Sequence, residues 1–89
     1  MTASASVEIV NERGLHARAS ARFVKLAGVF DAEVRVTKDD QTVDAQSIMG
    51  LMMLAASPGS EIVVEADGPD AEAALAAVVA LAKARFGED

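Results

Sequence analysis

The chain has no cysteine, tryptophan or tyrosine, and it has a single histidine among its 89 residues. The absence of cysteine excludes a disulfide, thiolate chemistry and a cysteine-ligated metal. With one histidine, a zinc site would need an unusual majority of carboxylates, and the sequence contains no P-loop or dinucleotide fingerprint. We therefore expect neither a metal nor a cofactor. Small secreted domains usually need disulfides, so their absence favours the reducing cytoplasm.

Positive charge and long apolar runs are also scarce. Eight lysines and arginines stand against 14 aspartates and glutamates, which gives a formal net charge of −6. Proteins that bind nucleic-acid phosphates need a basic surface, so we expect no nucleic-acid partner. No run of about 18 apolar residues occurs, and the first residues lack the basic and apolar regions of a signal peptide. We expect no membrane insertion and a cytoplasmic location.

The sequence does contain a series of short amphipathic segments. Its length suits one domain, residues 1–89, because it cannot build two independent cores. Alternating β-branched residues predict strands, and apolar residues at helical spacing predict helices. The predicted strands are 4–11, 33–37, 42–45 and 61–66, and the predicted helices are 16–27, 48–55 and 69–86. This β-α-β-β-α-β-α order predicts an α+β fold in which helices cover one side of an amphipathic sheet.

The last predicted helix has the most complete pattern. Pro69 suits its first position, acidic residues lie near its start and basic residues lie near its end. Its predicted buried stripe consists of Ala71, Leu75, Val78, Ala82 and Phe86. The corresponding stripe of the first predicted helix consists of Ala19, Phe23, Leu26 and Ala27. These stripes predict packing and assign no function.

The only histidine, His16, directly precedes the first predicted helix, within the segment GLHARASARF. The first backbone N–H groups of a helix have no intrahelical partner and attract anions. Arg18 adds a guanidinium, which suits phosphate. A neutral imidazole is a nucleophile, so this arrangement would accept a phosphoryl group and hold it. The alternative is a solvent-exposed histidine that lies near a helix start without any function.

A second segment, SIMGLMMLAA, begins with Ser47, which suits the N-cap of a short helix. This two-turn helix has more apolar residues than one core-facing side can hold. We expect Leu51 and Leu54 in the core, and Met49 and Met52 are the candidates for an exposed patch. Flexible methionine side chains suit surfaces that bind several partners. The alternative is ordinary core filling.

Three basic residues, Arg18, Arg22 and Lys25, share one face of the first predicted helix. They form a cationic stripe on a protein that is acidic as a whole. Such a stripe would steer the protein towards acidic partner surfaces. The alternative is a solvated helix face that has no partner.

Two of these segments resemble the HPr family, the histidine-containing phosphocarriers of the phosphoenolpyruvate-dependent phosphotransferase system. GLHARASARFV resembles the active-site segment of the family, and DAQSIMGLMMLA resembles the segment around its regulatory serine. Their separation and the order of elements also agree, so the resemblance covers essentially the whole chain. It implies an open-faced β-sandwich, with a four-stranded antiparallel sheet covered on one side by three helices.

The resemblance also implies roles for individual residues. His16 matches the histidine that is phosphorylated on Nδ1, and Arg18 matches the arginine that assists transfer. The backbone N–H groups of Ala17 and Arg18 would hold the phosphate. Ser47 matches the serine that an HPr kinase phosphorylates in many bacteria. The residues that match an exposed docking patch, or add positive charge beside it, are Ile48, Met49, Met52, Arg22 and Lys25.

By this resemblance the protein is a phosphoryl relay and not a turnover enzyme on its own. We expect a monomer that accepts phosphate from phosphorylated enzyme I and delivers it to enzyme IIA-type acceptors, under the control of an HPr kinase/phosphorylase. One departure is Ala19, where the family commonly has proline, although alanine also favours a helix.

Two alternatives to this relay stay open. The form HARAS is most similar to HPr-like proteins of alphaproteobacteria, which often serve nitrogen or carbon regulation. One alternative is therefore a regulatory protein of the nitrogen branch, whose phosphorylation state controls its partners and not sugar uptake. The other is a small ligand-binding or interaction domain with an incidental histidine.

Overall fold

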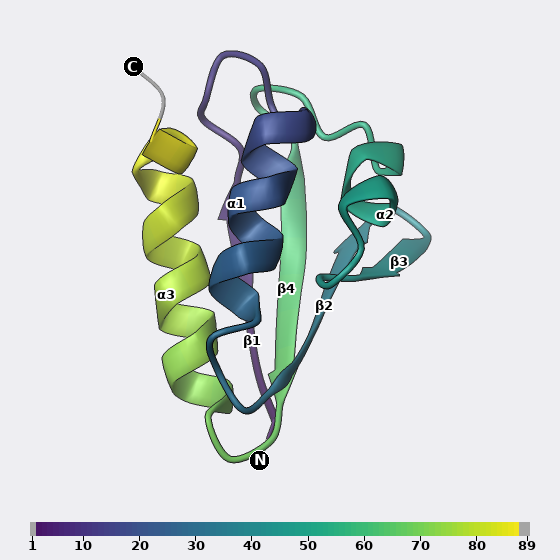
Figure 1. The fold of residues 1–89 in the computed structure, drawn as a ribbon. Helices are drawn as coiled ribbons and strands as arrows, with labels where there is room; N and C mark the ends of the chain where they lie inside the picture. Colours follow the sequence, from purple (N-terminus) through teal and green to yellow (C-terminus); the bar gives the residue numbers. More distant parts are fainter. Residues whose placement is uncertain (1, 88–89) are drawn as a thin grey trace.

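Residues 2–87 are described by a computed structural model, whose ribbon is drawn in Figure 1. The strands are β1 (Thr2–Glu8), β2 (Glu33–Lys38), β3 (Gln41–Asp44) and β4 (Glu61–Asp67). The helices are α1 (Ala17–Ala27), α2 (Ile48–Met53) and α3 (Ala71–Lys83), and a 3₁₀ turn (Arg85–Gly87) follows α3. The predicted order of strands and helices is confirmed.

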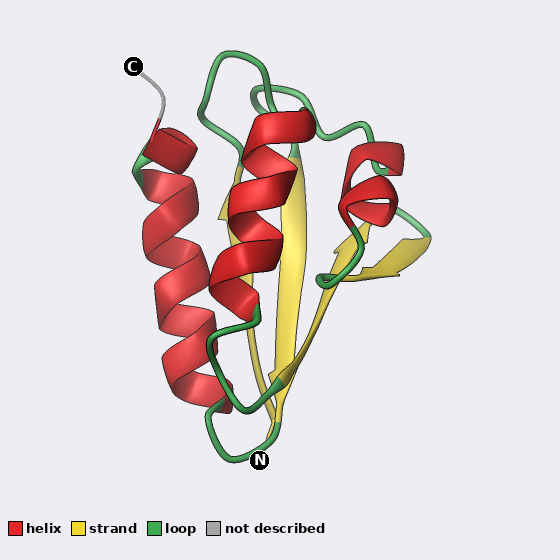
Figure 2. Ribbon diagram, viewed as in Figure 1, coloured by secondary structure: helices red, strands yellow, loops and turns green. Residues whose placement is uncertain are grey.

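The four strands form one antiparallel sheet in the order β1-β4-β2-β3. In β4 the side chains alternate, with Ile62, Val64 and Ala66 buried while Glu61 and Val63 are exposed. This two-residue period is typical of an antiparallel sheet with one packed face and one open face. The helices lie together against the packed face, which confirms the predicted α+β fold (Figure 2).

Two residues in the predicted helix stripes are only half-buried, namely Leu26 in α1 and Leu75 in α3. Ser20 and Ala74 are buried in their place. Burying a hydroxyl is tolerable when it is hydrogen-bonded, and Ser20 Oγ donates to the Leu15 carbonyl over 3.2 Å. The small residues let both helices approach the sheet closely.

The start of α3 differs from its prediction. The helix begins at Ala71 with Asp70 in the N-cap position, so Pro69 lies before the helix and not at its first position. The Asp70 carboxylate makes no capping bond, and it accepts a hydrogen bond from the Asp31 N–H over 2.8 Å. A contact between residues distant in sequence therefore sets this helix start, which sequence periodicity cannot reveal.

The end of α3 also differs from its prediction, because the helix stops at Lys83. Arg85 and Phe86 then turn the chain with positive φ angles of 59° and 54°. This turn brings Phe86 into the core, where its ring stacks on Phe23 with the centroids 6.4 Å apart. Phe86 is buried as predicted, but by a left-handed turn and not by a continuing helix.

Two further boundaries were predicted too late. β1 ends at Glu8 and not at Asn11, and the Asn11 side chain instead donates to the Gly14 carbonyl over 2.8 Å. α2 ends at Met53, because Ala55 has a φ of 52° and breaks the helix. Within residues 2–87, no helix combines the length and the hydropathy needed to cross a bilayer.

Candidate functional site

His16 is the N-cap of α1. Its backbone is extended, with φ −79° and ψ −176°, and its carbonyl accepts the first helical bond from Ser20 N–H over 2.9 Å. Its imidazole Nδ1 accepts a hydrogen bond from the Arg18 N–H over 3.2 Å. Helices usually use serine, threonine, aspartate or asparagine for this purpose. Because Nδ1 is an acceptor here, the proton of the neutral ring is assigned to Nε2.

This capping geometry gives Nδ1 a particular environment. The N–H groups of Ala17, Arg18 and Ala19 belong to the first turn, where no intrahelical acceptor is available. These groups carry the positive end of the helix dipole, and an anion placed among them is stabilised. The nucleophilic nitrogen of the imidazole therefore lies at the mouth of an anion-binding helix end.

The loop before His16 is fixed by close backbone contacts. Gly14 has a φ of +62°, which favours glycine, and a Cβ placed on it would lie 2.1 Å from the Ala56 carbonyl oxygen. The Leu15 N–H donates to that same oxygen over 2.9 Å, and the Leu15 side chain is buried. The segment that follows α2 thus supports the segment that presents His16.

An open hollow of about 610 Å³ adjoins the imidazole. Its lining residues are Glu12, Arg13, His16, Ala17, Arg18, Arg22 and Gly87. It holds three arginines against one glutamate, so the site is locally basic on a protein of net charge −6. Arginine suits phosphate because its planar guanidinium presents several donors at once.

Sequence reasoning missed three residues of this hollow, Glu12, Arg13 and Gly87. The signal for Arg13 was present, because it lies three positions before His16 in the same turn. The signal for Gly87 was absent, because only the left-handed turn after α3 brings the end of the described chain to the hollow. There, Arg22 Nη1 donates to the Phe86 carbonyl oxygen, which holds Arg22 beside the site.

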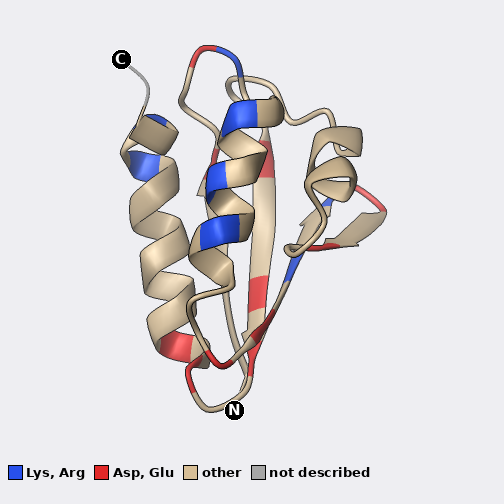
Figure 3. Ribbon diagram, viewed as in Figure 1, with Lys and Arg blue, Asp and Glu red and all other residues tan. Residues whose placement is uncertain are grey.

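The distribution of charge along the molecule agrees with a basic site. Figure 3 shows lysine and arginine along α1 and around the end of α3, on the side where α1 begins. Aspartate and glutamate gather at the start of α3 and at the adjoining ends of β2 and β4. An anionic partner surface would be attracted to the first region and repelled by the second.

Ser47 is the N-cap of α2, as predicted, and its Oγ accepts a hydrogen bond from the Gly50 N–H over 2.9 Å. Leu51 and Leu54 are buried, which confirms their assignment to the core. The large exposed apolar residues of this segment are Ile48, Met49, Met52 and Met53. Met53 was not predicted, although 69% of it is exposed. The patch lies on a helix that packs beside α1.

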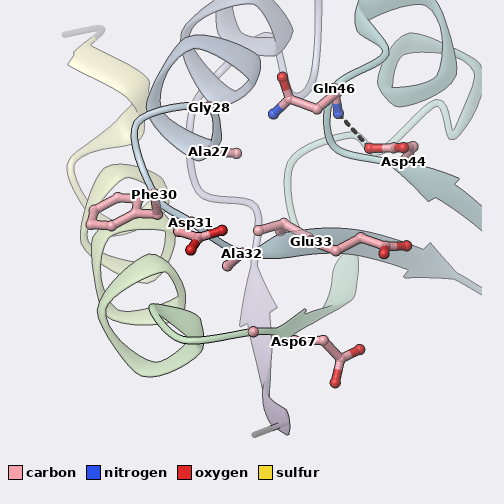
Figure 4. A pocket seen from close by; sticks show the side chains of 11 residues that line it. Ala27, Gly28, Phe30, Asp31, Ala32, Glu33, Asp44, Gln46 and Asp67 are labelled. Atoms are coloured by element: carbon pink, nitrogen blue, oxygen red, sulfur yellow. Dashed lines mark hydrogen bonds between the residues drawn. The ribbon is translucent and has the colours of Figure 1, made fainter.

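A second hollow, of about 620 Å³, lies near the opposite end of α1 and is shown in Figure 4. Four of its lining residues are acidic, namely Asp31, Glu33, Asp44 and Asp67. Asp44 accepts a bond from the Gln46 N–H over 2.8 Å, and the Thr2 hydroxyl and Arg35 guanidinium hydrogen-bond to Asp67 and lower its pKa. Asp44 and Asp67 are therefore engaged in the structure, and the four carboxylates would repel a phosphate, so the candidate site is the first hollow.

Comparison with known proteins gives the chain its class. The family described as "PTS HPr component phosphorylation site" matches residues 3–84. Phosphocarrier protein HPr of Cupriavidus necator is 52% identical over 80 residues, which cover 90% of each chain. Phosphocarrier protein NPr of Escherichia coli is 46% identical over 90 residues, which cover all of both chains.

A solved structure agrees with these relatives. The crystal structure of HPr-C-His from Thermoanaerobacter tengcongensis superposes with a TM-score of 0.93 at 42% identity, over 98% of both chains. The chain belongs to the HPr family of phosphocarrier proteins. The resemblance seen in its two sequence segments is therefore confirmed.

Proposed function

We propose that His16 accepts a phosphoryl group from phosphorylated enzyme I and passes it to an enzyme IIA-type acceptor in the cytoplasm. The observation that carries this proposal is the position of Nδ1, which lies at the positive end of α1 and accepts the Arg18 N–H. A side chain that is both a nucleophile and a helix cap can exchange its hydrogen bond for a bond to phosphorus.

The transfer step uses groups that this chain provides. The lone pair of Nδ1 releases the Arg18 N–H and attacks phosphorus, while the bond between phosphorus and the donor breaks and its electron pair returns to the donor. The ring proton stays on Nε2. The N–H groups of Ala17 and Arg18 then donate to the phosphoryl oxygens, and the guanidinium of Arg18 balances their charge.

Ala19 contributes to the same helix mouth. It is the third residue of α1 and is fully buried. Proline at this position would remove a backbone N–H, whereas alanine keeps it. The replacement of the family's common proline therefore adds a donor at the first turn, and it is compatible with phosphate binding.

The direct test is incubation with phosphoenolpyruvate, labelled in its phosphate, and a competent enzyme I. We expect label on the protein that is stable in alkali and labile in acid, as a phosphoramidate is. Absence of label with an enzyme I that phosphorylates another HPr would refute the relay.

Arg18→Ala is expected to slow phosphoryl transfer by about tenfold to a hundredfold, because a charge-assisted hydrogen bond contributes about 1.5–3 kcal/mol. The transfer rate of Arg18→Lys is expected to lie between those of the wild-type protein and Arg18→Ala, because lysine keeps the charge but loses the planar donors. The measurement is the initial rate of labelling. Lys38→Ala, which removes one half-buried positive charge at the end of β2, is the control. An equal loss in both variants would contradict a specific role for Arg18.

We further propose that Ser47 is phosphorylated by an HPr kinase/phosphorylase and that this slows the relay. Its Oγ lies at the start of α2, where a phosphate is tolerated by the first N–H groups of the helix. The modification would therefore change the charge of the docking patch more than the fold. The patch comprises Ile48, Met49 and Met52, with Arg22 and Lys25 on the neighbouring helix.

Ser47→Asp is expected to lower the rate of labelling by enzyme I several-fold, because the added negative charge would repel an acidic partner surface. Added salt is expected to restore part of the rate by screening this repulsion. Its unfolding should change little, since aspartate is also a good N-cap. Ser47→Ala should behave in the opposite way, with a normal rate and a free energy of unfolding lower by about 1 kcal/mol. A normal rate for Ser47→Asp would contradict the regulation by charge.

A nitrogen-branch regulatory role is the second candidate. The observation that favours it is the match over all of both chains with the relative called phosphocarrier protein NPr. In this role the phosphorylation state of His16 would control partner proteins and not sugar uptake. Parallel labelling by the enzyme I of each branch separates the two roles, because the cognate enzyme should phosphorylate the protein faster.

A further inference from the structure

The exposed face of α3 is apolar to a degree that a surface helix seldom shows. Of the 13 residues in α3, 11 are alanine, valine or leucine, and the other two are Glu72 and Lys83. One side of the helix packs on the sheet through Ala74, Val78 and their neighbours. A helix that packs on one side normally has polar residues on the other, and a helix that is apolar all round is normally covered.

The uncovered side forms a groove with the start of β1. Its lining residues are Ala3, Glu72, Leu75, Ala76, Val79, Ala80 and Lys83, and its volume is about 520 Å³. The two charged residues lie at opposite ends of this groove, and only alanine, valine and leucine line it between them. It shares no residue with the hollow at His16.

The adjoining strand edge is also open. β1 pairs only with β4 within the described residues, so its other edge has no partner there. Its first six residues, 2–7, contain no charged residue and no proline. Native sheets usually protect an edge with such residues or by covering it, because a bare edge pairs with other chains.

This side of α3 is complementary to the same side of a second copy of the chain. Glu72, Ala76, Val79 and Lys83 follow the spacing i, i+4, i+7 and i+11, which is that of a coiled-coil seam. If a second copy lies antiparallel, each Glu72 faces Lys83 of the other copy, and each Ala76 faces Val79. The small side chains permit close approach of the two helices. A dimer with a two-fold axis would thus pair Glu72 of each copy with Lys83 of the other.

We infer that this face of α3 and β1 binds a second copy of the chain. β1 and α3 run in the same direction (Figure 1), so the rotation that makes the helices antiparallel also turns the two β1 edges towards each other, antiparallel. The monomer expected from the sequence is then the form that the protein takes at low concentration. The dimer leaves the hollow at His16 and the patch on α2 uncovered, so the inference is independent of the proposed transfer function.

The test is sedimentation equilibrium up to millimolar protein concentration. The wild-type protein should approach twice its monomer mass of 9.2 kDa. Ala76→Glu should remain a monomer and stay folded, because residue 76 is exposed in the monomer. A wild-type protein that remains monomeric, or an Ala76→Glu variant that still dimerises, would overturn the inference.

Charge reversal provides a sharper test of the antiparallel arrangement. Glu72→Lys and Lys83→Glu should each weaken dimerisation by about fivefold or more, because each creates two like-charge contacts. The double variant should recover the wild-type dimerisation constant. It should not recover stability, because both charges then oppose the dipole of α3. Asp40→Lys, in the exposed β2–β3 turn, is the control for net charge. Failure of the double variant to recover would refute this pairing.

Discussion

Replacement of His16 by asparagine is expected to reduce phosphoryl acceptance from enzyme I to below about 1% of the wild-type rate, because the variant loses the nucleophile. His16 is the only imidazole, and the chain has no cysteine that could replace it. The fold should survive, since asparagine is a good N-cap and its side chain can accept the Arg18 N–H. The measurement is alkali-stable label transferred from phosphoenolpyruvate, with circular dichroism to check the fold.

A comparison with His16→Ala separates the chemical role from the structural role. Both variants should be unlabelled, but only alanine removes the cap, so its free energy of unfolding should be lower by about 1 kcal/mol. Alkali-stable label on either variant would refute the assignment to His16. Equal stability of the two variants would show that the bond from the Arg18 N–H to Nδ1 does not stabilise α1.

The Gly14→Ala variant is expected to lower the free energy of unfolding by about 2–5 kcal/mol. Alanine at a positive φ costs about 1–2 kcal/mol, and the shift needed to relieve a crowded contact costs about 1–3 kcal/mol more. The crowded contact is severe here, since the Cβ would lie 2.1 Å from the Ala56 carbonyl oxygen. The shift should also displace His16 and slow its labelling. Urea unfolding and the labelling rate measure the two effects.

Gly59→Ala is the matched control for this prediction. Gly59 also has a positive φ, of +89°, but a Cβ there would have no atom within 4 Å. Gly59→Ala should lower the free energy of unfolding by the conformational part alone, about 1–2 kcal/mol. Its labelling rate should stay normal, because the residue does not line the hollow. Similar losses of stability in both variants would contradict the role assigned to the Gly14–Ala56 contact.

Much of the fold could be predicted because local patterns and tertiary packing agree. The alternation in β4 and the apolar spacing of α1 each match the face that is buried. The predictions failed at helix ends that depend on distant contacts. The Asp70 carboxylate accepts a hydrogen bond from the Asp31 N–H, and the sequence gives no sign of this contact because the two residues are far apart in the chain. Phe86 enters the core through a left-handed turn that has no sequence pattern.

The site could be predicted in its centre and not at its rim. His16 and Arg18 are neighbours in sequence and begin a helix, so the sequence alone indicates an anion site. Arg22 and Gly87 meet only because the end of the described chain folds back onto α1. Such long-range juxtaposition needs the three-dimensional structure. The exposed side of α3 was missed for a different reason, since alanine is compatible with both a buried and an exposed helix.

The hydrogen bond between the Arg18 N–H and Nδ1 of His16 bears on the reversibility of a phosphoryl carrier. In the unmodified protein the imidazole nitrogen accepts one N–H group of the first turn of α1, that of Arg18. In the proposed phosphorylated form the phosphoryl oxygens would satisfy the same turn. The two forms therefore exchange one helix cap for another, and neither leaves the helix end uncompensated. A carrier built in this way stores little folding energy in its phosphorylated form, so its group-transfer potential stays close to that of the imidazole–phosphate bond itself.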